Sequence, residues 1–179
     1  MLQEKYLKQV IPAMKAKFGY KNSLEVPKIE KVVLNIGLNR ALTEKNPKFR
    51  EQVKETIVEI TGQRPVEVGA RQSIAGFKIR KGMVVGLKVT LRRNRMYDFV
   101  EKLIKIALPR TRDFRGISQK AVDEGGNLSI GLKEQIVFPE IKADQVALIH
   151  PLEVTVVTTT SKREEGLELL KLLGVPFKE

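Results

Sequence analysis

The sequence predicts an α+β fold: a largely antiparallel sheet with helices packed on one face and an open second face. Two observations support this prediction. Several short segments alternate apolar and polar residues with the two-residue period of a half-buried strand, and helical segments are interspersed among them. The 179 residues, 42% of them hydrophobic, contain no internal repeat and no low-complexity linker. We therefore expect a single domain over residues 1–179.

The first expected elements are a helix over residues 2–18 and a strand over residues 29–36. Apolar residues recur in the helix at every fourth position, and Gly19 follows as a C-cap. These apolar residues are Leu2, Tyr6, Val10, Met14 and Phe18. Pro12 is expected to kink or divide the helix. The strand alternation places Val32, Leu34 and Ile36 on one face, and Lys31 and Asn35 on the other.

The next elements are a helix and two strands separated by a basic loop. Asn46-Pro47 is typical of an N-cap followed by proline, and Thr61-Gly62 ends the helix. Residues 64–68 predict a short strand. Residues 83–92 show the most regular alternation in the chain, with an apolar face formed by Met83, Val85, Leu87, Val89 and Leu91. Between these strands, residues 69–82 are expected to form a loop or hairpin tip that projects from the sheet.

The second half of the chain predicts two helices and three further strands. Asn94 is expected to cap a helix that stops at Pro109. Short strands are expected over residues 127–132 and 136–138, and a longer strand over residues 152–160. Ser161 and Glu164 have the spacing of a capping box for the last helix, which Gly174 ends.

Positive charge is concentrated in the middle of the chain. Lys and Arg number 33 and Asp and Glu 21, which gives a formal net charge of +12. Residues 71–120 contain 14 basic and 3 acidic residues, and no acidic residue occurs between Glu67 and Asp98. A solvated basic face is the simpler interpretation, but solubility needs mixed charges. The gap in acidic residues therefore favours a phosphate-rich partner.

The first candidate site is the polar face of two strands. Lys88, Thr90 and Arg92 alternate onto one face of residues 83–92, as Lys31 and Asn35 do in residues 29–36. Lys and Arg suit phosphates, whereas Asn and Thr provide short hydrogen-bonding groups for phosphate, sugar or base edges. We interpret this surface as an open RNA-binding face, the alternative being a solvated sheet face.

The second candidate site is the loop over residues 69–82. Its glycines allow the backbone to approach a ligand, and its four basic residues can contact phosphates. These basic residues are Arg71, Lys78, Arg80 and Lys81. Ile74 and Phe77 could pack on sugars or bases, or anchor the loop to the core, and for Phe77 we expect anchoring.

The composition argues against most catalytic and metal chemistry. The chain has no cysteine and one histidine, and it lacks the phosphate-loop and nucleophile-elbow motifs. We expect no catalytic residue, no metal site and no cofactor. Two other classes stay open: an enzyme of ferredoxin-like architecture that acts on nucleic acid, and a peripheral membrane protein. The first lacks a predictive carboxylate spacing, and the second lacks a basic amphipathic helix, so we expect no membrane partner.

Several motifs resemble one known family. They occur in family order from about residue 5 to the C-terminus: Gly62-Gln63-Arg64-Pro65, Ser73-Ile74-Ala75-Gly76-Phe77-Lys78-Ile79-Arg80-Lys81-Gly82, Val89-Thr90-Leu91-Arg92, Ala107-Leu108-Pro109-Arg110, Arg112-Asp113-Phe114-Arg115-Gly116, Phe138-Pro139-Glu140-Ile141 and Pro176-Phe177. On these motifs, the chain is identified as a member of the family of bacterial large-subunit ribosomal protein five, which binds 5S rRNA.

The resemblance implies a non-catalytic, cytoplasmic component of the large ribosomal subunit, located in its central protuberance. Its implied partners are 5S rRNA, 23S rRNA, other 5S-associated ribosomal proteins, P-site tRNA, and a small-subunit head protein at an inter-subunit bridge. By motif, the expected 5S rRNA contacts are Lys31, Asn35, Gln63, Thr90 and Arg92, to which the strand alternation adds Lys88. The implied tRNA-contacting loop includes Arg71, Gln72, Ser73, Lys78, Arg80 and Lys81.

Overall fold

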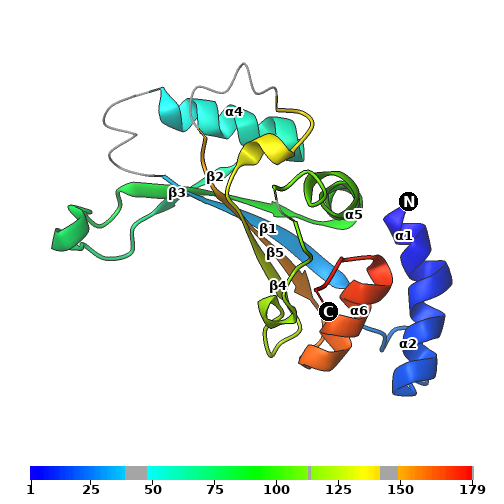
Figure 1. Ribbon diagram of the computed structural model, residues 1–179. Helices are drawn as coiled ribbons and strands as arrows, with labels where there is room; N and C mark the ends of the chain where they lie inside the picture. The colour runs from blue at the N-terminus through cyan, green and yellow to red at the C-terminus, as the bar shows by residue number, and fades with distance from the viewer. Residues whose placement is uncertain (39–47, 113, 142–148, 179) are drawn as a thin grey trace.

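The computed structural model describes residues 1–38, 48–112, 114–141 and 149–178. Within them, five antiparallel strands form one sheet in the order β2-β3-β1-β5-β4 (Figure 1). The strands are β1 (Ile29–Gly37), β2 (Val66–Gly69), β3 (Val84–Leu91), β4 (Leu128–Leu132) and β5 (Leu152–Thr158). The α-helices are α1 (Leu2–Lys5), α2 (Ile11–Phe18), α4 (Phe49–Thr61), α5 (Arg93–Lys102) and α6 (Arg163–Leu173). The predicted α+β fold class is confirmed.

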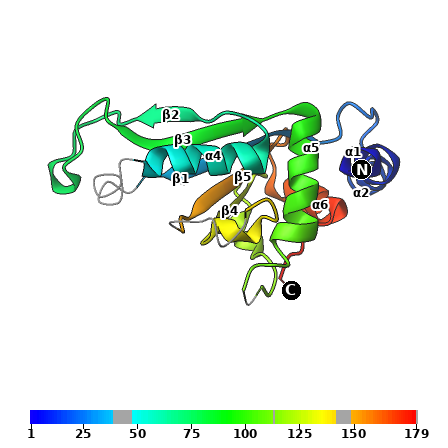
Figure 2. The same cartoon turned by 90° about the horizontal axis from the view of Figure 1, so that it is seen from above.

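One face of the sheet forms the floor of the hydrophobic core. Val32, Leu34 and Ile36 of β1 are at most 3% exposed, and the alternate residues of β3 are buried beside them. Figure 2 shows α4 and α5 lying across this side of the sheet. The apolar stripe of α4 packs into the same hydrophobic cluster. The inward face predicted for residues 29–36 is therefore confirmed, as is that of Leu87, Val89 and Leu91. Met83, which was expected on the same face, is 39% exposed, because it lies just before β3 at the base of the hairpin.

Each of two prolines follows a π-helical turn. The N-terminal helix widens over Tyr6–Val10, so the Ile11 N–H bonds to the Tyr6 carbonyl five residues back, just before Pro12. At the end of α5, a second such turn over Leu103–Ala107 precedes Pro109. Proline has no N–H and its ring crowds the preceding turn, so an extra residue in the turn relieves the conflict. Pro12 therefore divides the helix without ending it, and Gly19 terminates it with φ 73°.

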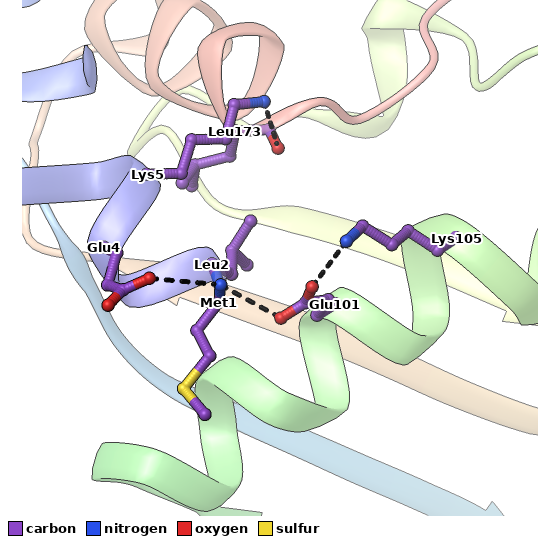
Figure 3. A network of polar contacts seen from close by, with 7 residues as sticks. All are labelled: Met1, Leu2, Glu4, Lys5, Glu101, Lys105 and Leu173. Atoms are coloured by element: carbon purple, nitrogen blue, oxygen red, sulfur yellow. Dashed lines mark hydrogen bonds and ion pairs between the residues drawn. The ribbon is translucent and has the colours of Figure 1, made fainter. Parts of the chain in front are cut away.

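A polar network joins the N-terminal helix to α5 and α6 (Figure 3). The Leu2 N–H donates to the Glu101 carboxylate at 3.0 Å, and Lys105 pairs with the same carboxylate. Lys5 donates to the Leu173 carbonyl at 3.1 Å, at the C-terminal end of α6. Hydrogen bonds from Lys105 and the Leu2 N–H hold the pKa of Glu101 below its ordinary value. The first helix is thus fixed to the body by ionised groups as well as by its buried face.

Three local predictions are wrong. Arg92, not Asn94, occupies the N-cap of α5, and no side chain caps that helix. The final helix begins at Arg163 without the expected Ser161–Glu164 capping box; the Thr160 hydroxyl instead accepts from the Lys162 N–H and donates to Glu165. Residues 136–138 form no strand, because Gln135–Val137 is a 3₁₀ turn. The buried Gln135 side chain accepts the His150 N–H there at 2.8 Å. The expected cap at 46–47 lies outside the described residues.

Candidate nucleic-acid interface

The second face of the sheet is open, as predicted. Strand register places Lys88 of β3 opposite Asn35 of β1, and Asn35 opposite Glu153 of β5. Lys88 and Arg92 are exposed and Thr90 is half-buried, so no helix formed by the described residues covers them. Because the core-facing residues alternate with these side chains along the same strands, burial of one face leaves the other free for a partner.

The middle of this face is neutral and rich in hydroxyl groups. Thr90 lies opposite Val33, Val33 opposite Thr155, and Thr155 opposite Ser129. The two hydroxyl oxygens of Thr155 and Ser129 are 3.3 Å apart. These residues extend the polar face across all of the sheet from β3 to β4. The basic residues gather on β3 and β1, while β5 contributes the carboxylate of Glu153.

A bulge at the start of β1 brings a carboxylate to two of the expected RNA contacts. Ile29 pairs with Thr158 and Lys31 with Val157, so Glu30 is the extra residue. Glu30 accepts from Arg92 at 3.2 Å and lies 3.7 Å from Lys31. The hydrogen bond from Arg92 lowers the pKa of Glu30. Arg92 and Lys31 thus share one intramolecular anion at the edge of the open face.

Gln63 lies next to Thr90, although the two residues are far apart in sequence. Its side-chain amide donates to the Thr90 carbonyl at 3.2 Å. The Thr61 hydroxyl accepts from the Gln63 N–H at 3.3 Å and shapes the turn after α4. Strand β2 begins only at Val66, opposite Lys88, so Thr90 lies beyond the part of β3 that pairs with β2. Its carbonyl can therefore accept a side chain on that side. The structure therefore brings Gln63 together with the residues of the open face.

The loop over residues 69–82 is a projecting hairpin tip that extends β2 and β3 away from the body (Figures 1 and 2). Ala70 and Met83 continue the pairing through a 2.8 Å backbone hydrogen bond, and Ile74 and Ile79 exchange two more near the end. The Ser73 hydroxyl accepts the Lys81 N–H at 2.9 Å. These bonds give the tip a defined shape, and the Ser73 oxygen takes part in holding it.

The side chains of the tip face solvent. Phe77 is 71% exposed, so the expectation that it anchors the loop to the core is wrong. Ile74 is also exposed. Arg71, Arg80 and Lys81 are exposed and form no ion pair within the described part of the chain. The tip is therefore a cationic surface with apolar side chains at its end, separate from the open face of the sheet.

Two features of the interface were missed in the sequence. The polar alternation of β5, with Glu153, Thr155 and Val157 on one side, was readable in principle from the same two-residue period. The position of Glu30 beside Arg92 was not, because the bulge shifts the alternation by one residue and leaves no sequence signal.

The described residues contain no arrangement that suggests catalysis. Among them, no group of three or more His, Asp or Glu side chains could hold a metal ion. None of the helices in the described ranges has the length and apolar character needed to cross a bilayer. An open sheet face, a cationic hairpin and a formal charge of +12 define a class of structural protein suited to polyanionic surfaces.

Comparison with known proteins identifies the family. Residues 22–80 match the family model described as Ribosomal protein L5, and residues 84–177 match a second model, which describes the C-terminus of the same ribosomal family. The chain therefore belongs to the ribosomal protein L5 family. It is 55% identical over 179 residues to "Large ribosomal subunit protein uL5" of Dictyoglomus turgidum, covering 100% of this chain and 99% of the relative. The protein of the same name from Carboxydothermus hydrogenoformans is 53% identical over 176 residues, covering 98% of this chain and 97% of the relative.

Family membership makes this chain a structural component of the large ribosomal subunit and not an enzyme. Its partners include ribosomal RNA, and in bacteria its place is the ribosome of the cytoplasm. The enzyme alternative is thereby excluded.

Proposed function

We propose that this ribosomal protein binds 5S rRNA through the open face of its sheet and helps attach that RNA in the central protuberance. The observation that carries the proposal is that Lys88, Thr90 and Arg92 lie on a sheet face that no helix in the described part of the chain covers. Asn35 lies directly opposite Lys88, and Gln63 contacts Thr90. Residues from three separate segments therefore converge on one surface.

The open face suits a folded RNA more than a single base. Lys31, Lys88 and Arg92 supply positive charge for phosphates, while Asn35 and Thr90 present short side chains held by paired strands. A sheet fixes such groups before binding, so little side-chain entropy is lost. Since the bases of an A-form helix are poorly accessible from its major groove, we expect contacts to phosphates and 2′-hydroxyls to dominate.

The hairpin tip forms the second part of the proposal. We propose that it contacts P-site tRNA through Arg71, Gln72, Ser73, Lys78, Arg80 and Lys81, which are all exposed. Its projection beyond the sheet allows it to reach a different RNA from the one on the open face (Figure 1). Further proposed partners are 23S rRNA, other 5S-associated ribosomal proteins, and a small-subunit head protein at an inter-subunit bridge. Residues 1–179 act in this proposal as a single domain.

Two alanine variants test the open face. Asn35→Ala and Thr90→Ala should each weaken 5S rRNA binding by roughly 1–3 kcal/mol, because a hydrogen-bonding partner at the RNA surface is lost. Thr56→Ala is a matched control, since the Thr56 hydroxyl bonds to the Gln52 carbonyl within α4. Equal 5S rRNA affinity in the wild type and both test variants, measured by filter binding, would remove Asn35 and Thr90 from the interface.

A double variant tests the division between the two surfaces. Arg80→Ala with Lys81→Ala should leave binding to isolated 5S rRNA unchanged and weaken P-site tRNA binding to ribosomes that carry the variant. The Lys81 N–H bond to Ser73 involves the backbone, so the shape of the tip should survive. If the double variant loses 5S rRNA binding, the proposed separation of the two surfaces is wrong.

A further inference from the structure

A groove lies along the edge of the sheet, between α4 and β2. Its volume is about 700 Å³. The residues that line it are Glu51, Lys54, Glu55, Val58, Glu59, Arg64, Pro65 and Glu67. Glu67 pairs with Leu87, a core-side residue of β3, so the groove opens on the helix side and not on the open face. It is therefore a surface separate from the proposed 5S rRNA interface.

Strand β2 forms one wall of the groove and is the last strand of the sheet. In the described part of the chain it pairs only with β3. Alternate residues of such an edge strand direct their N–H and C=O groups away from the sheet, where another strand can bond to them. Val58 and Pro65 add apolar surface beside this edge, and Val58 is 37% exposed.

The opposite wall of the groove is acidic. Glu51, Glu55 and Glu59 recur every four residues on one side of α4, are exposed, and form no ion pair with any described residue. Glu67, by contrast, is held by Lys54 at 2.6 Å, with Arg50 at 3.7 Å. Like charges at this spacing destabilise a helix. The stripe therefore has a cost in the free protein that a cationic partner would remove.

We infer that this groove binds an extended, lysine- or arginine-rich segment of another polypeptide, which adds a strand to β2. The spacing fits: carboxylates four residues apart on a helix are about 6 Å apart along its axis, and alternate residues of a strand are about 6.6 Å apart. A segment with a basic residue at every second position can therefore meet all three carboxylates while its backbone pairs with β2. RNA phosphates would be repelled by the same stripe, so the charge selects a basic polypeptide.

The test uses the full-length protein and a fluorescent peptide that alternates arginine and threonine. The test variant is Glu51→Gln with Glu55→Gln and Glu59→Gln. The control variant is Asp98→Asn with Glu124→Gln and Glu164→Gln, which removes the same charge from exposed positions elsewhere. Because the test variant cannot form the three ion pairs with the peptide arginines, its peptide affinity should fall roughly tenfold. The affinity of the control variant should change little.

Backbone pairing is tested with the same peptide N-methylated at its threonines or at its arginines. One of the two peptides should lose binding, because only one set of N–H groups can face β2. Amide NMR shifts on peptide addition should concentrate at Val66–Gly69 and along α4. The inference is overturned if the wild type does not bind the peptide, if both charge variants lose affinity equally, or if both methylated peptides bind as well as the parent. Displacement of the peptide by an RNA hairpin at this groove would also overturn it.

Discussion

Replacing Lys88 with glutamine should reduce the salt dependence of 5S rRNA binding by a defined amount. Lys88 is exposed in the open face, faces Asn35, and forms no ion pair within the described residues. If it neutralises one phosphate, its loss should lower the log–log slope of affinity against salt by about 0.7–0.9. If about 6 phosphates are engaged, the wild-type slope should have a magnitude of about 4–5.

Arg92→Gln should behave differently, because Arg92 already has an anionic neighbour. Its guanidinium bonds to Glu30 at 3.2 Å, so the substitution leaves that carboxylate with only Lys31, at 3.7 Å, to offset its charge at the open face. We expect Arg92→Gln to weaken binding more than Lys88→Gln at the same salt concentration. Adding Glu30→Gln to the Arg92 variant should recover part of the loss, since the repulsive charge is removed.

The assay is fluorescence anisotropy of labelled 5S rRNA over a series of KCl concentrations. Arg80→Gln at the hairpin tip is the control, and its slope should equal that of the wild type. The reasoning is refuted if Lys88→Gln keeps the wild-type slope, or if Glu30→Gln makes the Arg92 variant weaker still.

Three further predictions concern stability. Gly166→Ala should lower Tm by several degrees in calorimetry, because the added Cβ would lie 2.4 Å from the Gly126 carbonyl oxygen and overpacking costs about 1–3 kcal/mol; an unchanged Tm would contradict this contact. Burial raises the pKa of Tyr6 to about 12 and also raises the pKa of Tyr97; burial together with Glu165 raises the pKa of Tyr20 to about 12. Because each folded pKa exceeds the ordinary 10.0, the neutral tyrosines stabilise the fold fully below pH 10, and this stabilisation is lost as the pH rises towards the folded pKa values. Absorbance at 295 nm, which reports ionised tyrosine, should therefore rise only as the protein unfolds. A titration of the folded protein near pH 10 would refute this. Glu101→Gln should lower the free energy of unfolding at pH 7, because the pKa of Glu101 is depressed in the fold. The difference from wild type should become smaller once the pH falls below 4.5, the ordinary carboxyl pKa. Urea unfolding at pH 7 and at a pH below 4.5 measures the difference, and an equal difference at both would contradict the prediction.

The sheet could be predicted from the sequence because burial of one face leaves a two-residue period. Residues 83–92 contain five apolar residues at alternate positions, and the strand covers 84–91 with Leu87, Val89 and Leu91 buried on the expected face. The last helix ends at Gly174 as predicted, where φ is 106° and a glycine is favoured. These signals are local, so a single sequence is enough to detect them.

The start of α5 and the exposure of Phe77 could not be predicted in this way. Asn94 has the right side chain for a cap, but the chain leaves β3 with Arg93 at φ 54°, and the helix already begins at that residue. Phe77 is a residue type usually found in a core, but it lies in the projecting hairpin and stays exposed. In both cases the path of the backbone decides the outcome, and residue type alone does not predict that path.

In the candidate interface, too, some features could be predicted from the sequence and others could not. The faces of Lys31, Asn35, Lys88 and Thr90 followed from alternation, and their proximity follows from the register of β1 and β3. The position of Gln63 came only from resemblance to a family, since its contact with Thr90 depends on where α4 ends. Whether these residues bind 5S rRNA stays a prediction.

Lysine acylation of the protein, free and bound to 5S rRNA, tests the central claim most directly. Lys31 and Lys88 lie on the open face, Lys81 at the hairpin tip, and Lys171 on the outer side of α6. Our account predicts that 5S rRNA protects Lys31 and Lys88 from acylation while Lys81 and Lys171 react at the rates of the free protein. Full reactivity of Lys31 and Lys88 in the complex would contradict it.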